Sequence, residues 1–369
     1  MAEPANDEPM TLIRVEGRAG RITLNRPRQI NALAYEQVAP IHDALTAWAD
    51  DPDVKLVILD GAGDRGLCAG GDVLHLYHAR DTEPELAERF WRDEYALNSA
   101  IHRYPKPFVA IMDGIVMGGG IGLSGHASHR VVTERSKLAM PETTIGLIPD
   151  VGGTWLLAHA PGEMGLYLGL LGERMGAADA IYAGFADTHV PSEELPGLIA
   201  ELTSPDGDPA GTAIAEVATA PPKALHALRQ DAIDRMFGHP DLASVITALS
   251  APDAPDWAGW ALETIEAKSP LAMQLTFESI RNARSQPSLE DALAVEYRLA
   301  NRLYQHGEFV EGIRALLVDK DKSPKWAHAS AADVPADMVA QWMAPGPDVS
   351  ELGLKPPANV DRRVAGTDA

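Results

Sequence analysis

Residues 107–153 constrain the fold more than any other part of the chain. They begin with a short apolar run, Phe108–Met112, which predicts a buried strand ending at the turn-forming pair Asp113-Gly114. Three consecutive glycines follow at positions 118–120. Because glycine has no Cβ atom, backbone N–H groups in such a run can approach a ligand closely and point at it. The stretch therefore predicts a strand that delivers backbone donors to a site.

Two acidic residues follow these glycines, each directly after a proline: Glu142 and Asp150. Backbone donors for a developing oxyanion, with two carboxylates nearby, indicate chemistry at an acyl group. A second interpretation explains the two acids equally well on their own, because acids after proline often begin helices. The pattern alone leaves both interpretations open.

The rest of the N-terminal half alternates between short apolar segments and helical patterns. Strands are predicted at residues 12–15, 21–24, 54–59 and 130–133, and helices at residues 35–48, 83–103 and within 154–184. Alternation of this kind indicates an α/β fold with largely parallel strands.

The C-terminal half is helical by pattern. Between residues 202 and 222 the composition shifts to Ser, Pro, Gly, Asp and Ala, which is typical of a linker. Ser269 and Ser288 then have the sequence context of helix N-caps, the second helix running to about His306. We therefore divide the chain into a catalytic core, a helical C-terminal region and a tail whose last fifteen residues are expected to fray, at residues 10–200, 215–330 and 331–369.

Composition excludes several classes of function. With 31 Lys and Arg against 53 Asp and Glu, the net charge is −22, which argues against nucleic acids and anionic membrane surfaces as partners. The single cysteine, Cys68, allows no internal disulfide and fits a reducing compartment. The acidic N-terminus has no recognisable signal and no apolar run reaches membrane-spanning length, so we expect a cytoplasmic protein.

Two motifs are decoys. Residues 120–125 match G-x-G-x-x-G, but the next strand begins about five residues later, too soon for the crossover helix of a dinucleotide-binding unit. His126 and His129 have the spacing of a metal site without an evident third ligand, so packing or surface roles are favoured and no metal is expected.

Several segments resemble the enoyl-CoA hydratase (crotonase) superfamily, and within it the 3-hydroxyisobutyryl-CoA hydrolases most. The resemblance covers roughly residues 10–330. The matching segments are LNRP at 24–27, CAGGD at 68–72, WRDEYALN at 91–98, MGGGIGLS at 117–124, AMPETTIGLIPDVGG at 139–153, EYRLA at 296–300 and GEFVEGIRALLVDKDKSPKW at 307–326.

The resemblance implies a crotonase-like spiral of ββα units with a helical C-terminal region. It also implies an oxyanion hole made by the backbone N–H groups of Gly71 and Gly119. The catalytic acids would be Glu142 and Asp150, with Glu94 lining the substrate pocket.

Hydratases of the superfamily use two glutamates to add water across a double bond. The second corresponds to Glu142, but the first falls on Gly122, which has no side chain. The resemblance therefore favours hydrolysis of 3-hydroxyisobutyryl-CoA, as in valine degradation. The alternatives are an enoyl-CoA hydratase or dienoyl-CoA-type isomerase, and a non-catalytic acyl-CoA-binding protein.

Coenzyme A would enter as part of the acyl-CoA substrate, with no separate cofactor. Candidate partners for its phosphates are Arg26 and Arg28, and also Lys320, Lys322 and Lys325, although ordinary surface positions explain each of them equally well. Assembly into a homo-oligomer is left open.

Overall fold

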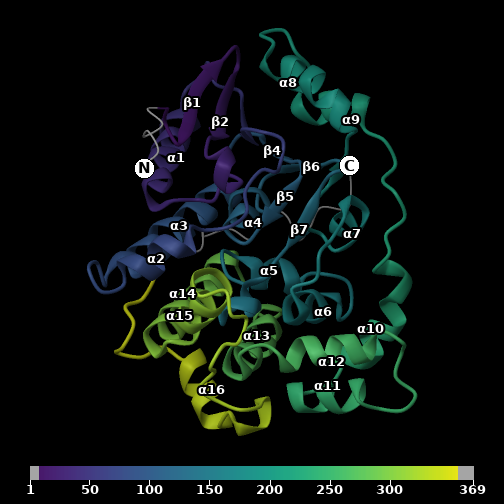
Figure 1. Cartoon of the computed structure of the whole chain (residues 1–369). Coiled ribbons are helices and arrows are strands. Elements are labelled where there is room, and N and C mark those ends of the chain that lie inside the picture. Colours follow the sequence, from purple (N-terminus) through teal and green to yellow (C-terminus); the bar gives the residue numbers. More distant parts are fainter. Residues whose placement is uncertain (1–7, 356–369) are drawn as a thin grey trace.

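The computed structural model describes residues 8–355, which form a mixed α/β fold (Figure 1). Six strands make the main sheet in the order β1-β2-β3-β4-β6-β8. Strands β1 and β2 form an antiparallel hairpin, and every other neighbouring pair is parallel. The strands are β1 Thr11–Glu16, β2 Ala19–Leu24, β3 Leu56–Gly61, β4 Phe108–Met112, β6 His129–Val132 and β8 Thr188–His189. This confirms the predicted fold class.

The central strands are apolar on both faces because each face has its own cover. In β4, Phe108, Ala110 and Met112 belong to the main hydrophobic cluster, whereas Val109 and Ile111 belong to a second cluster on the opposite face. This alternation is the period-two geometry of a strand buried on both sides. The second cluster is covered by α8 (Leu195–Thr203) and α9 (Ala210–Val217). Part of the segment with linker composition is therefore a packed helix.

Helices of the N-terminal half lie against the main cluster. They are α1 Tyr35–Ala49, α2 Val73–Ala79, α3 Leu86–His102, α4 Gly119–Ser124, α5 Gly153–Ala158, α6 Met164–Leu171 and α7 Ala177–Tyr182. A second small sheet pairs β5 (Ile115–Met117) with β7 (Lys137–Ala139). An isolated bridge between Cys68 and Val116 brings the CAGGD segment beside β5, which leads into the glycine run.

After α9 an extended segment runs along the edge of the molecule to the C-terminal helices (Figure 1). These are α10 Gln230–Phe237, α11 Leu242–Leu249, α12 Ala258–Glu266, α13 Pro270–Ala283, α14 Leu289–His306, α15 Glu308–Ile313, a π-helical turn Arg314–Val318 and α16 Ala336–Met343. Short 3₁₀ turns lie at Pro27–Gln29, Glu142–Ile145 (η2), Ser192–Glu194, Ala227–Arg229 and Ala331–Asp333. Ser269 and Ser288 accept hydrogen bonds from Ala272 N and Asp291 N, so both predicted N-caps are confirmed.

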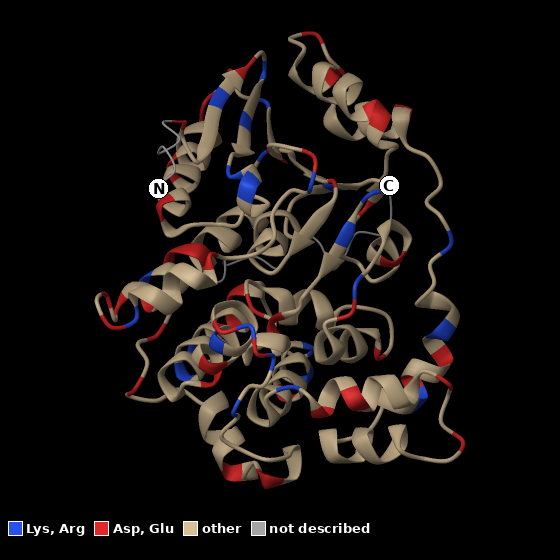
Figure 2. Ribbon diagram, viewed as in Figure 1, with Lys and Arg blue, Asp and Glu red and all other residues tan. Residues whose placement is uncertain are grey.

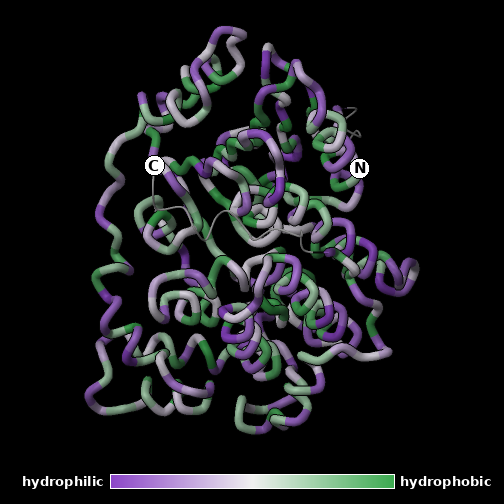
Figure 3. Tube along the Cα trace, turned by 180° about the vertical axis from the view of Figure 1, so that it is seen from behind, coloured by the Kyte–Doolittle hydropathy of each residue, from purple (hydrophilic) through white to green (hydrophobic). Residues whose placement is uncertain are grey.

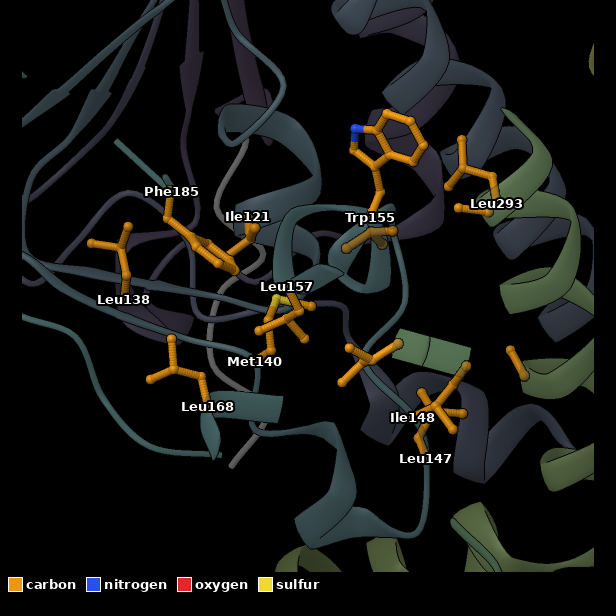
Figure 4. Packing of buried hydrophobic residues seen from close by; sticks show 14 of the residues in the cluster. Ile121, Leu138, Met140, Leu147, Ile148, Trp155, Leu157, Leu168, Phe185 and Leu293 are labelled. Atoms are coloured by element: carbon orange, nitrogen blue, oxygen red, sulfur yellow. The ribbon is translucent and has the colours of Figure 1, made fainter. Parts of the chain in front are cut away.

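The helical C-terminal region shares the main hydrophobic cluster with the N-terminal half. Helices α14 and α5 are in contact, and Figure 4 labels Leu293 of α14 and Trp155 of α5 among the residues of this cluster. Figure 3 shows hydrophobic residues recurring between hydrophilic ones along the helices, as helices with one buried face require. The residues expected to fray lie, from 356 onward, outside the described part of the chain. Within residues 8–355, no helix combines the length and apolar character needed to cross a membrane.

Candidate active site

A cavity of about 190 Å³ lies where the glycine loops of the N-terminal half meet the C-terminal helices. It brings together Gly71, Gly119, Glu94, Glu142 and Asp150, which are five of the residues predicted to form the site. Apolar side chains complete its wall, among them Phe90, Trp91, Ile145, Leu147, Phe309 and Leu317.

Backbone hydrogen bonds place the two loops that carry the proposed oxyanion donors. Leu33 N donates to Gly70 O at 2.9 Å and Asp72 N donates to Leu33 O at 2.8 Å, so this bridge does not use the Gly71 N–H. Gly119 is the first residue of α4, where N–H groups have no acceptor within the helix. A Cβ atom added to Gly119 would lie 3.2 Å from Gly71 N, so the two backbone segments are in contact.

Two positions beside the cavity must be glycine because carboxylate oxygens lie too close to leave room for a Cβ atom. Gly118 has φ +48°, and a Cβ atom there would lie 2.6 Å from Glu142 Oε1. A Cβ atom on Gly119 would lie 2.8 Å from Glu94 Oε1. Any larger residue would push a carboxylate out of the cavity, which explains the glycines by space as well as by backbone conformation.

Glu94 and Glu142 are buried acids with unused hydrogen-bonding capacity. Among the described residues, Glu94 Oε1 and Glu142 Oε2 have no hydrogen-bond partner. Burial raises the pKa of Glu142 well above its usual range, and the nearby Asp150 charge raises it further. The same two causes, in the same order, raise the pKa of Glu94. Both groups therefore favour the protonated state more than an exposed glutamate does.

Asp150 is held by a buried tyrosine. The Tyr95 hydroxyl donates to Asp150 Oδ2 at 2.7 Å. Burial raises the pKa of Asp150 to about 6, while the hydrogen bond from Tyr95 opposes that rise. Of these two opposing effects on Asp150, burial is the larger.

The turn after Asp150 is anchored by two buried side chains, His126, for which a packing or surface role was favoured, and Glu296, which the sequence prediction missed. His126 Nε2 lies 2.8 Å from Val151 O and is placed to donate to it. Glu296 of α14 accepts hydrogen bonds from Gly152 N at 2.7 Å and Thr154 N at 2.9 Å. Glu296 lies in the matching EYRLA segment, but a matching segment does not tell which side chains meet in space.

A second missed residue, Lys268, supports the turn that carries Glu142. Lys268 lies just before α13 and is buried. Its Nζ donates to Thr143 Oγ1 at 2.7 Å, Leu170 O at 2.9 Å and Leu171 O at 2.7 Å. Burial lowers the pKa of Lys268 to about 7, and the Glu142 charge opposes that change. No sequence motif marked this lysine.

The basic residues proposed for the coenzyme A phosphates differ in their surroundings. Arg26 is engaged in the protein, pairing with Asp72 at 2.8 Å and donating to Ala32 O at 2.6 Å. Arg28 is exposed, as are three lysines that follow the π-helical turn, Lys320, Lys322 and Lys325. In Figure 2 basic residues are interspersed with acidic ones. Contact of any of them with phosphate stays a prediction.

Among residues 8–355, no group of three or more His, Cys, Asp or Glu side chains is arranged to hold a metal ion. The site is therefore described by its carboxylates and its backbone donors.

Comparison with known proteins identifies the family. The family model described as enoyl-CoA hydratase/isomerase matches residues 19–343. Curated relatives named mitochondrial 3-hydroxyisobutyryl-CoA hydrolase are 38% identical in Xenopus laevis, covering 89% of this chain and 87% of the relative, and 37% identical in Homo sapiens, covering 88% and 85%. These relatives are named mitochondrial, so the prediction of a cytoplasmic location is wrong. It rested on the absence of a signal, which does not establish a location.

Solved structures agree on the family but carry different names. A carnitinyl-CoA dehydratase from Mycobacterium thermoresistibile is 45% identical with a TM-score of 0.87, covering 94% of this chain and 98% of that one. An enoyl-CoA hydratase from Rhodobacter sphaeroides 2.4.1 is 44% identical with a TM-score of 0.86, covering 93% and 100%. With the family model and the relatives, these likenesses establish that the chain belongs to the enoyl-CoA hydratase/isomerase (crotonase) family.

Proposed function

We propose that this protein hydrolyses the thioester of 3-hydroxyisobutyryl-CoA to 3-hydroxyisobutyrate and free coenzyme A, a step of valine degradation. The relatives that carry this name match over nearly nine-tenths of the chain. Coenzyme A enters as part of the substrate, and no separate cofactor is proposed.

One observation carries the proposal: Glu94 and Glu142 line the same cavity, and Glu94 Oε1 and Glu142 Oε2 are buried without a hydrogen-bond partner among the described residues. A buried polar atom without a hydrogen bond costs about 1–3 kcal/mol, so such atoms call for a polar ligand. The water that attacks the thioester, beside Glu142, and an acyl hydroxyl beside Glu94 would satisfy both. The protonation favoured at Glu94 allows it to donate to that hydroxyl as well as to accept from it.

The reaction needs charge stabilisation and one carboxylate near the carbonyl carbon. The N–H groups of Gly71 and Gly119 would bind the thioester oxygen and stabilise the negative charge that develops on it. Glu142 either attacks the carbon to give an anhydride or takes a proton from the attacking water, and both routes use the same carboxylate. The C–S bond breaks, the thiolate of coenzyme A receives a proton, and water supplies the second acid oxygen. Asp150 would position the water or the substrate.

Hydration of an enoyl-CoA is the second candidate, because the two solved structures with about 45% identity carry hydratase or dehydratase names. The surroundings of Gly122 argue against it. A Cβ atom at Gly122 would lie 2.7 Å from Val151 Cβ and 2.9 Å from Asn98 Nδ2, so a glutamate there has no room. Hydration would have to use Asp150 as its second acid.

The test follows free thiol and the ultraviolet absorbance of the enoyl group with purified protein. We expect 3-hydroxyisobutyryl-CoA to release thiol readily, and crotonyl-CoA to lose its double bond slowly or not at all. The thiol assay is unobstructed because the one cysteine of the chain, Cys68, is buried. Efficient hydration without thiol release would overturn the proposal.

Glu142→Gln provides the matched variant, since it keeps the size of the side chain and removes the carboxylate. We expect turnover to fall by about two orders of magnitude or more, with coenzyme A affinity largely retained. The role of Glu94 is tested with isobutyryl-CoA, which lacks the hydroxyl. We expect the wild type to hydrolyse it much more slowly than 3-hydroxyisobutyryl-CoA, and we expect Glu94→Leu to reduce the ratio of the two rates. Wild-type turnover in Glu142→Gln would remove Glu142 from the mechanism.

A further inference from the structure

We propose that Glu296, on helix α14, is a positioning residue that holds the turn carrying Asp150 in its catalytic conformation. The proposal rests on the function proposed above for that site. The helical C-terminal region would then do two things: its side chains line the cavity, and Glu296 positions a catalytic acid.

Glu296 binds the turn at three donors. Its Oε2 accepts from Gly152 N at 2.7 Å, and its Oε1 accepts from Thr154 N at 2.9 Å and from the Thr154 hydroxyl. Glu296 is fully buried. Burial raises the pKa of Glu296 to about 8, and the hydrogen bonds from Thr154 and Gly152 oppose that rise. The carboxyl group therefore fixes two amides at the start of α5.

The turn needs this support because its backbone is strained. Val151 has φ +54° and Gly152 has φ +79°, two successive left-handed residues. Valine is β-branched, so a left-handed conformation at this position is strained and persists only where neighbouring groups enforce it. Glu296 on Gly152 N and His126 on Val151 O are the groups that enforce it here.

The strained residues directly follow Asp150. The Asp150 carbonyl accepts from Gly153 N at 2.6 Å, which closes the turn, and the Asp150 carboxylate meets the Tyr95 hydroxyl on the other side. If Val151 relaxed, Asp150 would rotate away from Tyr95 and from the cavity. Glu296 is absent from the residues that line the cavity, so it acts through the turn and does not touch the substrate.

Glu296→Gln is the test, because the amide keeps the shape but turns an NH₂ group toward one of the backbone donors. We expect kcat to fall about 10- to 100-fold with KM changed less than about twofold, as for a displacement of roughly 1 Å of a catalytic group. The control is Glu290→Gln, a buried carboxylate on the same helix that binds Ser99 and Arg103 of the α3 end. Glu290→Gln should lower stability without selectively lowering kcat.

A second variant covers the case in which Glu296→Gln does not fold. Thr154→Val keeps the side-chain size and removes only the hydroxyl donor, so kcat should fall about two- to fivefold in the same direction. Unchanged kcat in the folded variants would overturn the proposal.

Hydrogen exchange of residues 147–157 gives a readout that does not depend on activity. We expect these amides to exchange at least about tenfold faster in Glu296→Gln than in the wild type or Glu290→Gln. A wild type that hydrolyses no acyl-CoA would refute the proposed function, while the exchange data would still decide whether Glu296 holds the turn. Equal exchange in all three proteins would refute the positioning role.

Discussion

The two sides of the cavity are built in different ways. The donor side, Gly71 and Gly119, is placed by backbone hydrogen bonds among residues of the N-terminal half. The carboxylate side, Glu142 and Asp150, lies on short turns that are anchored by buried titratable side chains. Those anchors, Lys268 and Glu296, lie 125 and 144 residues away in sequence from the hydrogen-bond partners Thr143 and Gly152.

The difference follows from what each side must present. Backbone donors need close approach and little else, which glycine provides by having no side chain. Acids with raised pKa need burial, and burial of charge is costly unless each group has partners. The long-range anchors supply hydrogen bonds to the turns, so the C-terminal helices help to hold the carboxylate side.

The largest effect should follow from breaking the donor side. Gly119→Pro removes one N–H from the first position of α4, where proline is compatible with a helix. Loss of one oxyanion donor costs about 3 kcal/mol, so kcat should fall by roughly 100-fold or more. Steady-state kinetics with a circular dichroism check of folding measures this. A folded proline variant with full activity would show that Gly119 is not a donor.

Gly119→Ala keeps the N–H and therefore tests the effect of adding a Cβ atom by itself. From sequence alone it would be the gentle substitution, but the structure places its Cβ atom 2.8 Å from Glu94 Oε1 and 3.2 Å from Gly71 N. The methyl group would therefore occupy the donor site, and activity should fall with this variant too. Gly197→Ala in α8, whose Cβ atom meets nothing within 4 Å, is the matched control and should keep full activity.

The same contrast explains what the sequence could and could not predict. The donor side is local: the glycine run and the CAGGD segment were visible as motifs, and their positions meet in the structure. The acids were visible because each follows a proline close to the glycines. Lys268 and Glu296 were not, because a partner more than 100 residues away leaves no spacing pattern to find.

Other departures have similar causes. Residues 202–222 have the composition of a linker, but alanines and Ile214 form an apolar face on α9 that the sheet buries. Arg26 stays a candidate for the coenzyme A phosphates, and the structure adds that its guanidinium is paired with Asp72. Composition and residue type do not tell whether a segment packs or what a side chain binds, because both depend on which residues lie next to it in the fold.

The next effect in size should come from removing Lys268, the anchor of the Glu142 turn. Lys268→Met keeps most of the volume but leaves the Thr143 hydroxyl and two carbonyls at the end of α6 without their donor. Free energy of unfolding should fall by about 2 kcal/mol, measured by urea denaturation. Without the nearby cation the pKa of Glu142 rises further, so we expect kcat to fall about tenfold.

Lys106→Met is the control for this variant, because Lys106 also donates to backbone carbonyls near a helix C-terminus, those of Trp48 in the last turn of α1 and of Asp51 just beyond it. It should lower stability and leave kcat unchanged. If both lysine variants lower kcat equally, the effect is a general loss of stability and the carboxylate side has no special anchor there.

The smallest effect concerns the proton on Asp150. Burial raises the pKa of Asp150 to about 6 and the Tyr95 hydroxyl opposes that rise, so Tyr95→Phe should raise the pKa further. Because the folded pKa lies above the unfolded value of about 3.9, folding takes up a proton, and stability is lost as the pH rises through this window. If Asp150 acts as a carboxylate, activity falls below the same pKa.

Besides the ionisation of Glu142, we therefore expect one near pH 6 on the acid side of kcat/KM in the wild type. It should move up by about one pH unit in Tyr95→Phe, with only a few-fold loss at pH 8. Tyr104→Phe is the control, since the Tyr104 hydroxyl donates to Leu45 O, away from the cavity. Its acid limb should match the wild type. A limb that stays in place in Tyr95→Phe, or moves to lower pH, would mean that the ionisation seen in the kinetics belongs to another group, and that the carboxylate side works without an ionised Asp150.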